Sequence, residues 1–111
     1  MTMPQRITFP RAHRGLILTE TEHAFLLDII GPFQGAAVEA LLRRALPAHD
    51  GQRIAGTDDE LDLLLAAVDI EANGFLRVES EHAGKELRKP KAGGNADRLR
   101  RIAEKIERHL S

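Results

Sequence analysis

The sequence predicts a single small domain that is mainly α-helical with a minor β component, an α+β fold of about four helices with short strands. Three observations lead to this prediction. Apolar residues recur at helical spacing in four segments. Two of these segments open with a Thr-x-x-Glu capping box, and Gly or Pro residues separate the segments. The length of 111 residues suits one domain, whose core must be aliphatic because the chain has four Phe and no Tyr, Trp or Cys.

Composition divides the chain into four parts. Residues 1–15 are predicted to form a basic, extended N-terminal segment, and residues 16–90 a helical core domain. Residues 91–95 are predicted to be a flexible joint, because they are rich in Gly. Residues 96–111 are predicted to form a basic amphipathic C-terminal helix.

The net charge of −1 conceals a strong asymmetry along the chain. Residues 1–18 carry a charge of +3, residues 19–83 a charge of −9, and residues 84–111 a charge of +5. A chain with an acidic middle and basic ends can pair its charges by folding back or by packing against a second copy. It can also present its basic end to a polyanion.

Short β-like runs precede the first predicted helix at residues 6–9 and 16–18, and nearby Pro and Gly residues keep them short. The first helix begins after Thr19, an N-cap whose capping box Glu22 completes. We expect it to run to about Ile30, because the Gly-Pro pair that follows cannot continue a helix.

The second helix is expected over about residues 35–46. Four apolar residues share one of its faces, namely Val38, Leu41, Leu42 and Ala45. Pro47 closes this helix, and a turn-rich loop with a short strand at residues 53–55 is expected to follow.

The third helix opens with a second capping box, formed by Thr57 and Glu60, and is expected to end at Asn73-Gly74. Its main apolar stripe consists of Leu61, Leu64, Leu65 and Val68, widened by Leu63 and Ala67. A helix this apolar is expected to be largely buried. Shifted by 38 residues, segment 19–30 matches segment 57–68 in its caps and apolar positions, which either duplication or convergence explains.

Residues 75–89 fit either a β-hairpin or a short helix. Read as a hairpin after three helices, the order of elements over about residues 18–90 resembles a winged helix, with 75–89 as the wing. The resemblance implies a nucleic-acid-associated regulator. The third helix would then enter the major groove. It carries six acids and no Lys or Arg before Gly74, so phosphates would repel it.

The last helix carries the predicted interaction surface, with one apolar face and one basic face. The candidate residues are Leu99, Arg100, Arg101, Ile102, Lys105, Ile106, Arg108 and Leu110. A helix of roughly 15 residues is marginally stable alone, so its apolar face must pack on something. Packing on its own chain and packing on a second copy both remain open.

The tetrapeptide Glu-x-Glu-His occurs twice. The pairs Glu20 with His23 and Glu79 with His82 have the Glu-x-x-His spacing that supplies half the ligands of a di-iron carboxylate bundle. However, Glu20 lies at a helix start, where acids interact with the helix dipole. No further carboxylates are singled out by the sequence. We therefore expect no metal and no cofactor, and keep a small metal-binding protein as an alternative.

The leading expectation is a non-enzymatic protein–protein interaction or assembly protein that forms a homodimer. A nucleic-acid-associated regulator that binds through the basic C-terminal region is the main alternative. Hydrolase and nucleotide-binding motifs are missing, since the chain has no Cys, no Gly-x-Ser-x-Gly and no phosphate-binding loop. The N-terminus lacks the apolar run of a signal peptide, and no apolar stretch approaches a membrane span. We therefore expect a cytoplasmic protein without membrane contact.

Overall fold

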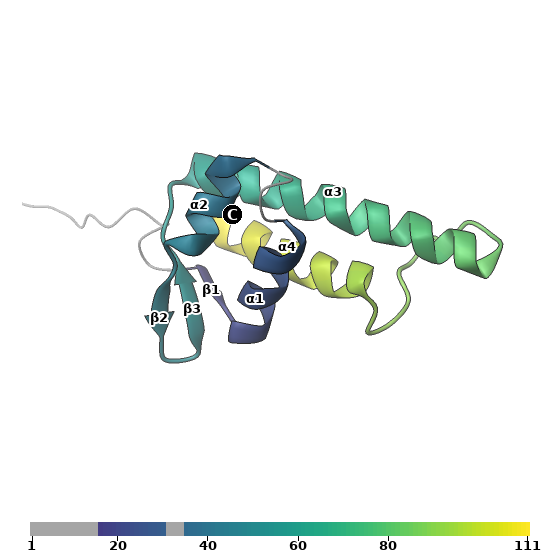
Figure 1. Cartoon of the computed structure of the whole chain (residues 1–111), viewed down its shortest axis with the longest axis horizontal. Helices are drawn as coiled ribbons and strands as arrows, with labels where there is room; N and C mark the ends of the chain where they lie inside the picture. Colours follow the sequence, from purple (N-terminus) through teal and green to yellow (C-terminus); the bar gives the residue numbers. More distant parts are fainter. Residues whose placement is uncertain (1–15, 31–34) are drawn as a thin grey trace, which may run out of the picture.

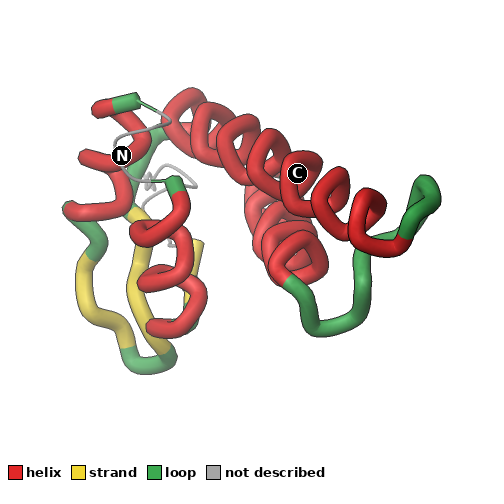
Figure 2. Tube along the Cα trace, turned by 45° about the vertical axis from the view of Figure 1, so that its right-hand side comes forward, coloured by secondary structure: helices red, strands yellow, loops and turns green. Residues whose placement is uncertain are grey.

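The computed structural model describes residues 16–30 and 35–111 and confirms the predicted α+β class. A small three-stranded sheet lies at one end of the molecule, with two short helices beside it (Figure 1). The two longest helices run side by side away from this end (Figure 2). In chain order the elements are β1 (Leu16–Leu18), α1 (Glu20–Ile29), α2 (Ala36–Arg43), β2 (Leu46–Ala48), β3 (Gly51–Ile54), α3 (Asp58–Ala83) and α4 (Asn95–Leu110).

The sheet is antiparallel, with the strand order β1-β3-β2. Leu16 lies opposite Ile54 in the β1–β3 pair, and both side chains are buried. The β2–β3 hairpin turns at residues 49–50, and β3 begins at Gly51, whose φ of 149° is a conformation that L side chains rarely adopt. A Cβ at this position would lie 2.1 Å from the backbone oxygen of Leu18 on β1. Only glycine therefore fits where the hairpin meets the end of β1.

Both capping boxes are confirmed. The backbone N–H of Thr19 donates to Glu22 Oε1 at 2.8 Å, and the backbone N–H of Glu22 donates to Thr19 Oγ1 at 3.0 Å. Thr57 and Glu60 exchange the same two bonds at the start of α3. Each box fixes the direction in which a helix leaves its preceding strand. As a result the chain twice forms a short strand followed by a capped helix.

One hydrophobic core joins the sheet to all four helices. Its largest fully buried side chains are Leu18, Leu26, Ile30, Leu41, Leu42, Ile54, Leu61, Leu64, Val68, Leu99, Ile102 and Ile106. The most extensive helix contact is between α3 and α4, and α4 also touches β1. The C-terminal helix of this structure therefore packs on its own chain.

The predicted end of the third helix at Asn73-Gly74 is wrong. Helix α3 continues through Gly74 to Ala83 and ends at Gly84, which has the left-handed φ of 71°. A glycine inside a helix costs only about 1 kcal/mol relative to alanine. The next residue, Phe75, packs against the core, and the free energy gained from this contact exceeds the cost of the glycine.

The ambiguity at residues 75–89 is resolved in favour of the helix, and the predicted wing at this place is wrong. Residues 75–83 belong to α3, and residues 84–94 form a loop without a strand. The hairpin of this fold is β2–β3, which lies between α2 and α3 instead. Leu46 to Ala48 were expected to end or follow the second helix, but they pair with β3.

The other local predictions have mixed outcomes. The run at residues 16–18 is confirmed as β1, and the strand expected at 53–55 is found slightly earlier as β3. The predicted N-terminal segment and the run at 6–9 lie outside the described residues. In the predicted joint at 91–95, the backbone N–H of Lys91 donates to Glu79 Oε1 at 2.9 Å.

We predict that Gly51→Ala lowers the free energy of unfolding by at least about 2 kcal/mol, because it adds both backbone strain and a clash with the β1 backbone. Gly84→Ala is the matched control. Gly84 also has a positive φ, but no atom of the described residues lies within 4 Å of its Cβ position. The Gly84→Ala variant should lose only about 1 kcal/mol of unfolding free energy. Urea unfolding, followed by far-ultraviolet circular dichroism, measures the unfolding free energy of both variants. Equal losses in the two variants would contradict the close approach of Gly51 to the β1 backbone.

Candidate functional site

The apolar half of the predicted interaction surface lies in the core of the chain. Leu99, Ile102 and Ile106 are 0%, 1% and 0% exposed, and half-buried Leu110 packs against the same cluster. These side chains contact the inner faces of α3 and the sheet end, so they are not available to a partner in this conformation. Sequence periodicity correctly identified an apolar face on α4, but periodicity does not say what covers such a face.

The basic half of the predicted surface is largely engaged within the chain. Arg101 Nε lies 3.3 Å from Asp97 Oδ2, one helical turn away. Lys105 Nζ donates to Glu22 Oε1 on α1 at 2.6 Å. Nearby Arg98, on the same helix, places its guanidinium carbon 3.9 Å from the centre of the Phe25 ring. Arg108 is exposed, near the C-terminal end of α4.

The Lys105–Glu22 pair connects α4 to the capping box of α1. Glu22 Oε1 accepts both the Lys105 ammonium and the backbone N–H of Thr19. Burial by itself would raise the pKa of Glu22. The hydrogen bonds from Lys105 and Thr19, together with the Lys105 charge, outweigh burial and lower this pKa below its ordinary value of 4.5.

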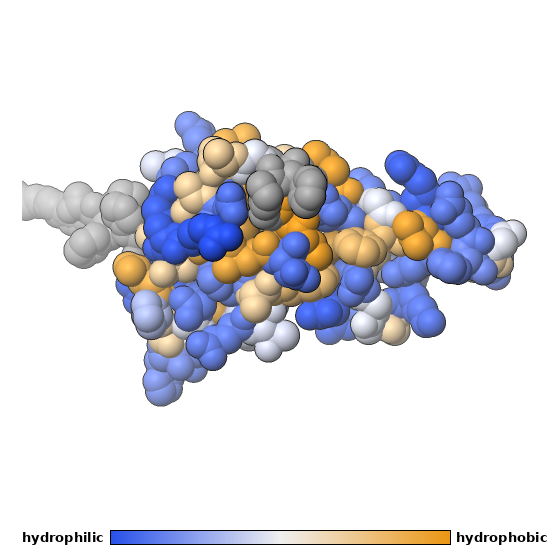
Figure 3. All heavy atoms as spheres, viewed as in Figure 1, coloured by the Kyte–Doolittle hydropathy of each residue, from blue (hydrophilic) through white to orange (hydrophobic). Residues whose placement is uncertain are grey.

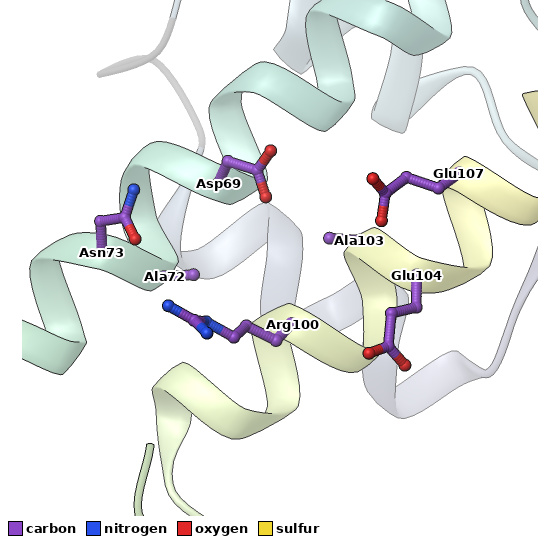
Figure 4. Close-up of a pocket in the computed structure, with 7 residues that line it drawn as sticks. All are labelled: Asp69, Ala72, Asn73, Arg100, Ala103, Glu104 and Glu107. Atoms are coloured by element: carbon purple, nitrogen blue, oxygen red, sulfur yellow. The ribbon is translucent and has the colours of Figure 1, made fainter. Parts of the chain in front are cut away.

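A polar groove of about 350 Å³ runs along the seam between α3 and α4. Figure 4 shows its side chains, with Asp69 and Asn73 on α3 facing Arg100 and Glu107 on α4. The guanidinium of Arg100, the remaining basic candidate, points toward Ala72 and Asn73 of α3. Two acids of α4 itself, Glu104 and Glu107, also line the groove.

The two Glu-x-x-His pairs lie in different parts of the molecule. Glu20 and His23 are on α1, whereas Glu79 and His82 are near the far end of α3 (Figure 1). His23 Nε2 lies 2.8 Å from the backbone oxygen of Leu42, which occupies one of its ring nitrogens. Within residues 16–30 and 35–111, no three His, Asp or Glu side chains gather closely enough to hold a metal ion.

Glu79 and its neighbour Ser80 hold the loop that joins α3 to α4. Glu79 Oε1 accepts the backbone N–H of Lys91, and Ser80 Oγ accepts the backbone N–H of Leu87 at 3.0 Å. A cavity of about 530 Å³ lies beneath this loop, lined by Glu79, His82, Ala83, Leu87, Lys89 and Lys91. The second Glu-x-Glu-His thus fastens a loop, and the first caps a helix.

The surface that sequence reasoning missed is the outward face of α3. Leu63, Ile70 and Val78 are 54%, 59% and 47% exposed. Ala66 and Gly74 lie between them at a spacing of three or four residues, so the five residues form one line along the helix. We call this line the outward stripe. Figure 3 shows hydrophobic surface, in orange, over α3 among blue polar residues.

One sequence signal could have revealed the outward stripe. Leu63, Ile70 and Gly74 recur at i, i+7 and i+11, a spacing that keeps residues on one side of a helix. The third helix predicted from the sequence ends at Gly74 and so does not contain Val78. Without Val78, the spacing assigns Leu63 to the edge of the buried stripe rather than to a second, exposed stripe.

Comparisons of the chain with protein-family models, with curated proteins and with solved structures gave no match. Among the helices that the structure describes, none combines the length and the apolar character needed to cross a membrane. Function therefore has to be inferred from the side chains described above.

We predict that Lys105→Met lowers the free energy of unfolding by about 1 kcal/mol at neutral pH, since it removes a partly buried ion pair. Because the folded-state pKa of Glu22 is depressed, the contribution of the pair is present above about pH 4.5 and is lost as pH falls through the lower folded-state value. The difference from the wild type should thus vanish in acid.

Urea unfolding at several pH values, followed by circular dichroism, measures this difference. Lys85→Met is the matched control, because Lys85 is exposed on the loop after α3 and should change stability little. A deficit in Lys105→Met that is the same at pH 7 and in strong acid would show that lost packing, rather than the ion pair with Glu22, is responsible.

Proposed function

We propose that this chain is a non-enzymatic assembly protein that forms a homodimer through the outward stripe of α3. The observation that carries the proposal is the continuous line of half-exposed aliphatic side chains, Leu63, Ile70 and Val78, on one side of the longest helix. Single exposed apolar residues are ordinary on protein surfaces, but a contiguous apolar line marks an interaction site.

The energetic reason for association is that the apolar side chains of the outward stripe are still exposed to water in the single chain. Burying a whole Leu, Ile or Val side chain contributes about 1.5–3 kcal/mol, so a side chain that is half exposed has about 1 kcal/mol left to gain. The stripe is presented on a regular helix of 26 residues, which is already ordered in the single chain. Association through it therefore requires little additional ordering of the backbone.

Some of the groups that would support the alternatives have other partners within the chain. The basic residues Arg101 and Lys105 of α4 form ion pairs within the chain, which reduces their capacity to neutralise phosphates. Of the four candidate metal ligands, His23 contacts a backbone oxygen and Glu79 holds a loop. These contacts favour roles in the fold for residues that the sequence offered for binding chemistry.

Size-exclusion chromatography with light scattering tests the proposal. We predict that the wild-type chain elutes at twice its mass of 12.3 kDa and that Leu63→Glu and Ile70→Glu elute as monomers. Glu is a good helix former, so these variants should keep α3 intact. The matched control is Leu46→Glu on β2, because Leu46 has the same exposure of 54% as Leu63 but lies off the stripe. It should remain dimeric.

Three results would overturn the proposal. The first is a monomeric wild type at every concentration measured. The second is a dimer that both α3 variants leave intact, since the interface would then lie elsewhere. The third is strong near-ultraviolet absorbance that travels with the protein peak. A chain without Trp and Tyr absorbs little there, so the absorbance would indicate bound nucleic acid and favour the regulator alternative.

A further inference from the structure

We propose that the two copies pair their α3 helices antiparallel, with a two-fold axis at Ile70 and an ion pair between Asp62 of each copy and Arg77 of the other. This inference rests on the proposed function and adds the orientation, the register and the polar contact that selects them. It is carried by the spacing of apolar residues about Ile70 and by the distribution of charge along α3.

The outward stripe is nearly symmetric about Ile70. Leu63 and Val78 lie seven and eight residues to either side, about 10.5 and 12 Å along the helix axis at ~1.5 Å per residue. Turning a second helix end for end about Ile70 therefore places Leu63 of one copy at the level of Val78 of the other. Each large apolar side chain then meets another, and Ile70 meets its own copy.

Small residues occupy the intermediate positions. Ala66 and Gly74 each lie four residues from Ile70, so the antiparallel arrangement sets Ala66 of one copy against Gly74 of the other. No atom of the described residues lies within 4 Å of the Cβ position of Gly74, so no contact with another described element explains the glycine. Small residues facing each other would allow the two helix backbones to approach closely between the Ile70 contact and the outer Leu–Val contacts.

Charge distinguishes the antiparallel from the parallel arrangement. Arg77 is the only Lys or Arg of α3, and it is exposed. Asp62 is also exposed and lies within about 60° of Arg77 around the helix, on the flank that carries Ala66. The antiparallel pair brings Asp62 of one copy to Arg77 of the other, twice. A parallel pair would instead set the two Asp62 carboxylates at one level and the two Arg77 guanidinium groups at another.

At the outer ends of the interface, the antiparallel arrangement brings like charges together. Asp59 and Glu81 lie eleven residues to either side of Ile70, so the antiparallel pair brings these two acids to the same level. They stand at the open ends of the interface, where solvent and salt screen like charges. The inner Asp62–Arg77 contacts lie beside the apolar contacts and are screened less.

The ion pair can be tested by charge reversal. Arg77→Asp places acids at both inner positions and should raise the dimer dissociation constant about tenfold, because two favourable contacts become repulsive. Adding Asp62→Arg to the same chain restores two opposite-charge contacts and should recover most of the loss. Arg108→Asp, an equal charge change on α4, should leave the dissociation constant unchanged. Sedimentation equilibrium with interference optics measures all four chains. A double variant no better than Arg77→Asp alone would overturn the ion pair.

The orientation can be tested by cross-linking, since the chain has no Cys and each introduced Cys is the only one. A single Cys at position 70 should form an interchain disulfide with its own copy. Ala66→Cys alone and Gly74→Cys alone should not, because their copies lie about 12 Å apart along the axis, too far for a disulfide. A mixture of the Ala66→Cys and Gly74→Cys chains should cross-link. Non-reducing gel electrophoresis after mild oxidation gives the pattern.

The outcomes separate this inference from the proposed function. A parallel dimer would cross-link each of the three single-Cys chains to itself and would not favour the mixture. That pattern, or a lack of any disulfide in a chain that light scattering shows to be dimeric, would overturn the antiparallel register and leave assembly through α3 intact. A dimer that neither Leu63→Glu nor Ile70→Glu dissociates would overturn both the register and the proposed function.

Discussion

The burial of the apolar face of α4 is the interaction on which the other features of this molecule depend. Leu99, Ile102 and Ile106 are buried in the common core, where α4 packs on α3 and also touches β1. A helix of 16 residues is only marginally stable alone, so α4 forms because this face is covered. Because α4 packs on the inner face of α3, that face is part of the core. The outer face of α3 then carries Leu63, Ile70 and Val78, three of the four large hydrophobic side chains that are exposed among the described residues.

The charge asymmetry of the sequence is partly resolved within the fold. The basic C-terminal region meets the acidic middle at α1, where Lys105 pairs with Glu22 and Arg98 lies over the Phe25 ring. These contacts orient α4 rather than hold it, since partly exposed ion pairs contribute little beside a buried apolar face. The one base within the acidic middle of α3, Arg77, lies one turn after Asn73 and Gly74 and one turn before Glu81.

Features fixed by neighbouring residues could be predicted from the sequence, whereas features fixed by distant contacts could not. The caps at Thr19 and Thr57 depend on residues three positions away and were found. The continuation of α3 past Gly74 depends on Phe75 reaching a core built from remote segments. The strand β2, with a Pro in its centre, has low β propensity and exists because β3 is beside it. The capping role of Glu22 in the first Glu-x-Glu-His was likewise predicted, whereas the contacts of Glu79 and Ser80 in the second depend on residues 7 and 12 positions away and were not.

Helix α3 carries apolar residues on two opposite sides. Leu64, Val68 and Ala72 face α4 and the core, while Leu63 and Ile70 point away from them. A surface helix normally has a single apolar stripe and a polar remainder, whereas a helix that is apolar on more than one side is covered on each. Residues 16–30 and 35–111 supply only one of the two covers. The acids of α3 lie mainly on its flanks. There they remain in contact with water when a second helix covers the outward stripe. The distribution of residues around α3 therefore suits a helix that packs on α4 at one side and on a partner helix at the other.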